Sequence, residues 1–588
     1  MRNNSRQKKD VAPAGGGLAR TAALLGGFAL FSRLLGLARD MSMAWLLGGG
    51  AAADALVAAM RLPHVLRRLL GEGSLSMTLT ASLVRLWLEG GGPAVPEVPG
   101  GPRGAGNANT GLLARALSLR LGLVLALLTL AGLAAAPWLA KILAPGFSGV
   151  ELEHTAFLLR LCLPYVLAAG MAALGMALLH SMGIFWLPAL SPALFNLVML
   201  LAAGAAALGF FPPAQALAAG MLCGGIAQWF AQWLAVRRLL PVDFMNASQD
   251  APQGASAQTH SFHAGAESTR AVNRAAWHCL KLLPGGVLGA AAPQLAMLAA
   301  MALASGLGQG QVAALYYAER LLELPLGLVG VCLGMASLPA LSRLAAEGEF
   351  SGFGQHLSTA LRLTLMLSLP AAAGLAALGP QLVEGLLGHG AFDRQAAFET
   401  GMALLAYVPG LPAFACNRSL LAACNALGLV RRTAMSALWA VGGTLAAGLA
   451  LVHILGPEYS VLAPALAVSC GLWLQAILLL RLLGKTLPED AGCPSRGQTG
   501  GSWRLPFWLP GWQAMGRHVL AGGLTGIAAN LLLRLGTSWG LWPSLLAGIA
   551  GGVAVWAMVL LVLRDPDLFL LAGRLRKKPR VPIVDGSA

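Results

Sequence analysis

The chain has 588 residues, of which 57% are hydrophobic and only 11% are charged, and its formal net charge is +16. A soluble protein carries roughly 25% charged residues, so this composition excludes a soluble globular protein and predicts an all-α polytopic membrane protein. In such a protein an excess of Lys and Arg reports topology first. Nucleic-acid binding is not predicted, because no basic module with interleaved aromatic residues lies outside the apolar segments.

About fourteen transmembrane helices are predicted when roughly 20 apolar residues are taken as one span. In chain order they cover residues 21–47, 52–87, 111–143, 152–182, 184–210, 214–239, 274–305, 310–344, 355–379, 396–424, 429–455, 459–484, 515–536 and 540–564.

Polar linkers divide these helices into units. One linker follows the sixth helix, and another, which includes the aromatic stretch "WRLPFWLPGW", precedes the last pair. We therefore predict an N-terminal tail (1–20), an N-lobe of helices 1–6 (21–241), a cytoplasmic linker (242–273), a C-lobe of helices 7–12 (274–485), a linker with an interfacial segment (486–514), helices 13–14 (515–566) and a basic tail (567–588).

The basic residues predict the orientation of the chain. When the N-terminus is placed in the cytoplasm, the predicted outer loops contain one basic residue, Arg394. The inner loops and tails contain many, including "RLRKKPR" at 574–580. This asymmetry follows the positive-inside rule, so we predict that both termini are cytoplasmic.

An internal repeat relates helices 2 and 8. The stretch "ALVAAMRL" (55–62) resembles "ALYYAERL" (314–321), which places Arg61 opposite Arg320. A second pair, "SLSMTLTASLVRLWLEG" (74–90) and "CLGMASLPALSRLAAEG" (332–348), follows in register. Both helices run from outside to inside, so the repeat is parallel and predicts two lobes around a central cavity.

Charged side chains cluster in helices 1, 2 and 8. In helix 1, "FSRLLGLARD" (31–40) places Arg33 and Asp40 on one helical face and Ser32 and Arg39 on the adjacent face. In the first part of helix 2 the charged residues are Asp54, Arg61, Arg67, Arg68 and Glu72. Arg67 lies off the stripe that the others share unless Pro63 kinks the helix. Those at the start of helix 8 are Glu319, Arg320 and Glu323.

Two interpretations of these charges are open. The arginines could form buried salt bridges that hold the helices together, for example Arg33 with Asp40 and Arg320 with Glu323. Alternatively they line a wet cavity, where guanidinium groups suit an anionic headgroup such as a phosphate or diphosphate. Intramembrane charges usually mark function, and their concentration in three helices favours the cavity.

No metal site, cofactor or enzymatic activity is predicted. The eight cysteines include no CxxC pair, and the chain has neither a Walker A sequence nor a recognisable nucleophile–base constellation.

Three motifs resemble the MurJ (MviN) family, the lipid II flippases of the multidrug/oligosaccharidyl-lipid/polysaccharide exporter superfamily. They are "FSRLLGLARD", "ADALVAAMRLPHVLRRLLGEGSLS" and "YYAERLLELPLGLVGVCLG". The resemblance implies a V-shaped pair of lobes, with helices 13–14 forming a groove for a polyprenyl tail. It also implies a bacterial inner-membrane transporter that moves lipid II, an undecaprenyl-diphosphate-linked disaccharide pentapeptide, to the periplasmic leaflet for cell-wall synthesis.

The resemblance also assigns site residues. The family's cavity arginines fall on Arg33, Arg39, Arg67 and Arg320, and its helix 2 aspartate falls on Asp54. The charge pattern adds further substrate-binding candidates, namely Ser32, Asp40, Arg61, Arg68, Glu72, Glu319 and Glu323.

The sequence departs from the family in several respects, of which the most important concerns sodium. Some members bind sodium through acidic and amide side chains on helices 7 and 11, but residues 274–305 and 429–455 contain no acid here. The alternative function is export of another polyprenyl-linked saccharide. A cation-coupled drug antiporter fits less well, because fourteen helices and the arginine cluster argue against it.

Overall fold

The computed structural model of the chain describes residues 15–71, 108–182, 184–239, 294–456, 460–487, 509 and 511–576. Throughout these ranges the regular secondary structure is helical. Eight of the described helices are long and apolar enough to cross a membrane. The prediction of an all-helical polytopic membrane protein is therefore confirmed.

Where the structure describes them, the N-terminal helices follow the predicted spans with two interruptions; residues 72–87 of the predicted helix 52–87 lie outside the described residues. They are α1 (Gly15–Leu47), α2 (Ala51–Gly71), α4 (Ala108–Ala134), α5 (Ala136–Leu143), α6 (Gly149–Cys162), α7 (Tyr165–Ser181), α8 (Trp186–Ala207) and α9 (Pro213–Leu239). The predicted helix 111–143 is divided at Ala135, and the predicted helix 152–182 is divided before Tyr165. Pro164 lies at the second division and cannot donate a backbone hydrogen bond, which explains the break there.

In the C-terminal half, the predicted helix 355–379 is longer in the structure, extending over 350–387, and the predicted helix 396–424 is divided by a 3₁₀ turn. Residues 294–304 are helical. They are followed by α11 (Gln311–Ala346), α12 (Phe350–Leu387), α13 (Arg394–Tyr407), the 3₁₀ turn η2 (Val408–Gly410), α14 (Leu411–Ala426), α15 (Val430–Leu455), α16 (Leu462–Thr486), α17 (Trp512–Leu535), the 3₁₀ turn η4 (Thr537–Trp539), α18 (Leu541–Val562) and α19 (Pro566–Arg576). Helix α19 was not predicted, because its sequence begins the segment that we assigned to a basic tail.

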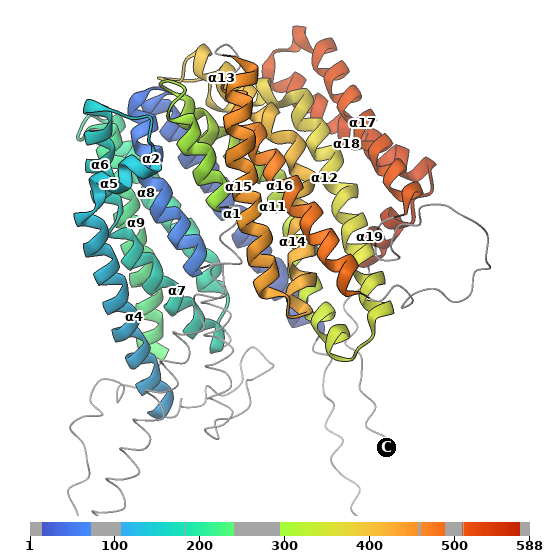
Figure 1. Cartoon of the computed structure of the whole chain (residues 1–588), viewed down its shortest axis with the longest axis horizontal. Coiled ribbons are helices and arrows are strands. Elements are labelled where there is room, and N and C mark those ends of the chain that lie inside the picture. Colours follow the sequence, from blue (N-terminus) through green and yellow to red (C-terminus); the bar gives the residue numbers. More distant parts are fainter. Residues whose placement is uncertain are drawn as a thin grey trace, which may run out of the picture.

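The helices form two groups and an outer layer (Figure 1). Helices α2 and α4–α9 lie together on the left, and α11–α16 lie in the centre. Helices α17 and α18 pack against α12 on the far side of the second group. Helix α1 packs mainly against α8 and also contacts α11 and α12, so it lies between the two groups.

The outer helices expose apolar side chains, as expected for surfaces in contact with lipid. On α4, leucines separated by three or four residues share one exposed face, namely Leu119, Leu123, Leu127 and Leu130. Such a surface would be unstable in water but is at no disadvantage in hydrocarbon.

The two groups are joined by close backbone packing where α2 and α11 begin. Gly310 precedes α11 with φ +87°, and a Cβ atom added there would overlap the carbonyl oxygen of Gly49. The amide of Ala391 also donates to the carbonyl oxygen of Trp45, with an N···O distance of 2.9 Å. The start of α11 and the turn between α12 and α13 are therefore held against the end of α1 and the turn that follows it.

Candidate functional site

A cavity of about 580 Å³ lies between the two helix groups. Its walls come from α1, α2, α7–α9, α11, α14 and α16, together with Gln294. Among the described residues, six arginines line it, whereas the lining acids are Asp40 and Glu323. The lining arginines are Arg33, Arg39, Arg67, Arg68, Arg320 and Arg418.

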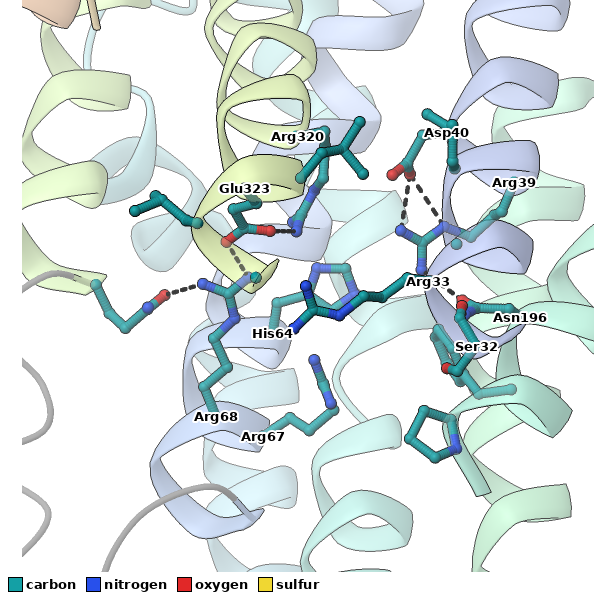
Figure 2. Close-up of a pocket in the computed structure, with 18 of the residues that line it drawn as sticks. Ser32, Arg33, Arg39, Asp40, His64, Arg67, Arg68, Asn196, Arg320 and Glu323 are labelled. Atoms are coloured by element: carbon teal, nitrogen blue, oxygen red, sulfur yellow. Dashed lines mark hydrogen bonds and ion pairs between the residues drawn. The ribbon is translucent and has the colours of Figure 1, made fainter. Parts of the chain in front are cut away.

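Arg39 and Asp40 form one wall of the cavity (Figure 2). Arg39 Nη2 lies 2.8 Å from Asp40 Oδ1, and its Nη1 donates to Asn196 Oδ1 at 2.9 Å. The hydroxyl of Tyr316 donates to the same oxygen of Asp40 at 3.1 Å. The amide of Asn196 in turn donates to the carbonyl oxygen of Ser32. This network of residues from α1, α8 and α11 holds the buried side chain of Arg39 in place.

Glu323 links two more arginines across the helix groups (Figure 2). Its Oε1 lies 2.7 Å from Arg68 Nη2, and its Oε2 lies 2.7 Å from Arg320 Nη1. Arg320 also lies over the ring of Tyr316, with 4.7 Å from the guanidinium carbon to the ring centre. A single carboxylate thus offsets two guanidinium groups, so the cavity keeps an excess of positive charge.

Arg33 extends from α1 into the middle of the cavity, between these two clusters (Figure 2). Within the described part of the chain, no hydrogen bond or ion pair holds its guanidinium group. A Cβ atom added at Gly327 would overlap this guanidinium. Gly327 therefore provides the space that Arg33 occupies against α11.

Helix α2 supplies a second row of basic residues. Pro63 lies inside the helix, which nevertheless continues to Gly71. His64, Arg67 and Arg68 all line the cavity, because residues three and four apart share a face of a helix. Arg67 therefore lines the cavity. The family motif implied this position, whereas the stripe of charges along helix 2 did not include Arg67.

Three predicted site residues, Arg61, Glu319 and Asp54, do not line the cavity. Arg61 forms a buried ion pair with Glu319, with 2.6 Å between Nη1 and Oε2. Asp54 accepts hydrogen bonds from the backbone N–H groups of Gly310 and Ala313 at 2.5 and 2.7 Å. These residues lie where α2 contacts α11. Glu72 lies outside the described residues.

The salt-bridge interpretation is partly correct. The predicted pair of Arg320 with Glu323 is present. The predicted pair of Arg33 with Asp40 is wrong, because Asp40 binds the neighbouring Arg39. The Arg39 side chain binds the carboxylate of the adjacent Asp40. Arg33 instead extends toward Gly327 of α11.

The sequence analysis missed several lining residues. Arg418 on α14 and Asn196 on α8 are the most informative of them. Arg418 is an arginine inside the apolar stretch "LPAFACNRSLLAACNA", so the same criterion that selected helices 1, 2 and 8 would have found it. Asn196 carries no charge and offered only the weaker signal of an amide in an apolar helix.

An all-helical membrane fold in which a cationic cavity lies between two helix groups is typical of transporters that carry an anionic substrate. The family model for the lipid II flippase MurJ matches residues 43–502. The chain belongs to the MurJ family of lipid II flippases, which confirms the predicted family and its function in peptidoglycan biosynthesis. The motif at 31–40 lies outside the matched residues.

Relatives match over most of the chain. The lipid II flippase MurJ of Burkholderia cenocepacia is 29% identical over 67% of this chain and 70% of its own length. A probable lipid II flippase MurJ of Bdellovibrio bacteriovorus is 30% identical over 80% of this chain and 82% of its own. One from Rhizobium tropici is 28% identical over 97% of this chain and 99% of its own.

Solved structures share the fold. A lipid II flippase MurJ in an inward closed conformation matches with a TM-score of 0.66 and 19% identity, covering 92% of this chain and all of that one. An inward-facing multidrug resistance MATE family transporter of the MOP superfamily matches with a TM-score of 0.60 and 15% identity, covering 79% and 99% of the two chains. The fold is therefore that of MurJ and the MATE transporters.

Proposed function

We propose that the arginine-lined cavity binds the diphosphate and adjoining sugar of lipid II while the chain carries this headgroup between leaflets by alternating access. The observation that carries the proposal is the charge of the cavity. Six arginines line it, and both lining acids already pair with arginines. Guanidinium groups bind phosphate oxygens bidentately, so this excess of positive charge suits a diphosphate.

The arginines would act differently within the cavity. Arg39 is held by Asp40 and Asn196 and offers a fixed positive charge. Arg33 projects to the centre, where an incoming phosphate would meet it first. Arg68 and Arg320 share Glu323, so a phosphate that binds either one competes with that carboxylate. The cavity thus combines one arginine that is held in place, Arg39, with arginines that can reorient toward a bound phosphate.

Alternating access requires one end of the cavity to be closed by contacts that can break. Such contacts join the helix groups where α2 and α11 begin. They are the Asp54 hydrogen bonds to Gly310 and Ala313, the Arg61–Glu319 pair, and the hydrogen bond from the Gly146 amide to the Ser305 hydroxyl. We infer that this closed end faces the periplasm and that these bonds open when the headgroup is released.

The proposal includes the full architecture predicted from the sequence. It has fourteen transmembrane helices, with six in each of two pseudosymmetric lobes (21–241 and 274–485) and a C-terminal pair (515–566). Both termini would be cytoplasmic. Cysteine labelling from outside should reach residues 380–395 and should not reach 242–269, and the opposite pattern would contradict this topology.

A related carrier lipid is the competing substrate. Another polyprenyl-linked saccharide would present the same diphosphate to the same arginines. The two proposals differ in the sugar and peptide, for which the cavity offers uncharged amides such as Gln228, Asn417 and Gln475.

Complementation separates these alternatives. Cells depleted of their own lipid II flippase should grow when this chain is supplied, and lipid II should reach the outer leaflet. Arg33→Ala, Arg67→Ala and Arg320→Ala should each abolish growth while membrane-inserted protein stays near normal. Arg39→Ala should abolish growth as well and should also lower the amount of protein, because it leaves the buried Asp40 without its ion-pair partner. Arg343→Ala is the matched control, because Arg343 is exposed and lies away from the cavity. Failure of the unmodified chain to expose lipid II would favour the other saccharide.

A further inference from the structure

Three buried titratable side chains meet at one end of the C-terminal helix pair, away from the cavity. They are His518 of α17, Asp565 between α18 and α19, and Asp567 of α19, and they are 1%, 0% and 1% exposed. His518 Nε2 lies 3.6 Å from Asp565 Oδ2 and 3.7 Å from Asp567 Oδ2. One ligand atom from each of the three residues lies within 4.8 Å of the others.

The backbone holds the two aspartates in this position. Arg564 lies in the turn after α18 and has a φ of +46°, the one positive φ of a non-glycine residue among the described residues. The amide of Asp565 then donates to the carbonyl oxygen of Leu560 at 2.9 Å. Asp565 Oδ1 accepts a hydrogen bond from the Asp567 amide at 2.9 Å, which leaves its Oδ2 directed at His518. The left-handed residue is unfavourable without glycine, so the surrounding packing must enforce this turn.

The polar atoms that converge here are buried without hydrogen bonds. Both ring nitrogens of His518, Oδ2 of Asp565 and Oδ2 of Asp567 have no hydrogen-bond partner among the described residues. Separations of 3.6 and 3.7 Å are too long for hydrogen bonds. They suit ligands of one ion, because two ligands each about 2.0–2.2 Å from a metal lie roughly 3–4 Å apart.

We propose that His518, Asp565 and Asp567 bind a divalent transition-metal ion of the Zn²⁺ type. Imidazole nitrogen and carboxylate oxygen are both ligands that Zn²⁺ takes in proteins, and water would complete a four-coordinate site. The ion would fasten α17 to the turn between α18 and α19. It would therefore fix the geometry of the C-terminal pair independently of substrate binding.

Two arginines border this site and bear on its charge. Arg362 Nε of α12 lies 3.2 Å from Asp567 Oδ1, so it can orient that ligand by holding its other oxygen. Arg517 Nη1 lies 3.6 Å from Asp565 Oδ2, and its side chain is 31% exposed. Arg517 can therefore turn toward solvent when a cation takes that oxygen. Through Arg362 the site also connects the C-terminal pair to the second helix group.

Metal content of the purified full-length chain tests the proposal. After treatment with a chelator and equilibration with Zn²⁺, the unmodified chain should retain about one ion in mass spectrometry of the metal. His518→Ala and Asp567→Asn should each weaken Zn²⁺ binding at least tenfold, because each removes a ligand. His453→Ala is the matched control, since His453 is an exposed histidine on α15. Equal retention by all variants would overturn the proposal.

A measurement on the unmodified chain guards against variants that fail to fold. X-ray absorption at the zinc edge should show one imidazole nitrogen and otherwise oxygen ligands. A sulfur ligand, several imidazoles or no bound zinc would overturn the assignment.

Discussion

Arg61 of α2 and Glu319 of α11 form an ion pair across the two helix groups, with side chains only 8% and 5% exposed. The sequence pattern placed both residues among the substrate ligands, but neither lines the cavity. Their burial makes the pair sensitive to loss of one member, because the remaining charge would be desolvated without a partner. A role in holding the closed end together follows more directly from this geometry than a role in binding.

We expect Glu319→Ala to destabilise the protein by about 3–5 kcal/mol, because it leaves Arg61 buried and unpaired. The double variant Arg61→Met with Glu319→Met should recover much of this loss, since both charges are removed. Unfolding midpoints of the purified chain in detergent would measure these effects. Glu347→Ala is the control, because it breaks the exposed Arg343–Glu347 pair and should cost no more than about 1 kcal/mol. Equal losses at the two sites would contradict the buried-pair argument.

Asp54→Asn should loosen the junction between α2 and α11. Both carboxylate oxygens of Asp54 accept backbone hydrogen bonds, but asparagine has one acceptor oxygen and would direct its NH₂ group at a donor. We expect a cost of about 1–3 kcal/mol and faster labelling of a cysteine placed at Ser305. Asp393→Asn is a matched control, because Asp393 caps α13 through a single bond to Ala396. Unchanged labelling of Ser305→Cys in Asp54→Asn would argue against a closed end held by Asp54.

Gly327→Ala should inactivate the transporter while leaving its abundance nearly normal. The added methyl group would overlap the guanidinium of Arg33 and displace it from the centre of the cavity. Growth in a flippase-depleted strain, measured beside membrane-inserted protein, would test this. Gly442→Ala is the control, since nothing lies within 4 Å of a Cβ atom added there. Normal growth of Gly327→Ala would show that the position of Arg33 is not critical.

Arg33→Lys and Arg39→Lys should restore function only in part relative to the alanine variants. A lysine ammonium supplies the positive charge but not the planar fork of donors that binds two phosphate oxygens. The deficit should be larger for Arg39, whose guanidinium already uses separate nitrogens for Asp40 and Asn196. Rates of lipid II exposure would measure it, and full activity of both lysine variants would favour simple charge attraction.

Transport should depend on membrane potential and persist without sodium. The predicted helices 7 and 11 contain no acid to serve as a hard oxygen ligand for a cation. Flipping by the purified chain in vesicles, with sodium replaced by potassium, would test the expectation. A steep sodium requirement would show that neutral oxygens are sufficient to couple the ion.

The sequence by itself determined the class of protein, the approximate positions of most helices and the family. These properties depend on local composition, helical periodicity and short motifs, all of which can be read along the chain. It also identified Arg33, Arg39, Arg67, Arg68 and Arg320 as a cluster, because arginines are costly in apolar helices wherever these helices pack.

Only the tertiary structure decided which charged residues share a site. Helical phase says which face a residue occupies, but not how deep that face lies or which helix covers it. Arg61 and Arg68 are seven residues apart on α2, yet one lies at the junction with α11 and the other in the cavity. Arg418 and Asn196 enter the same cavity from α14 and α8. His518 likewise meets Asp565 and Asp567 only because α18 ends in a tight turn that returns the chain to α17. Such contacts arise from packing between distant segments, which no local pattern encodes.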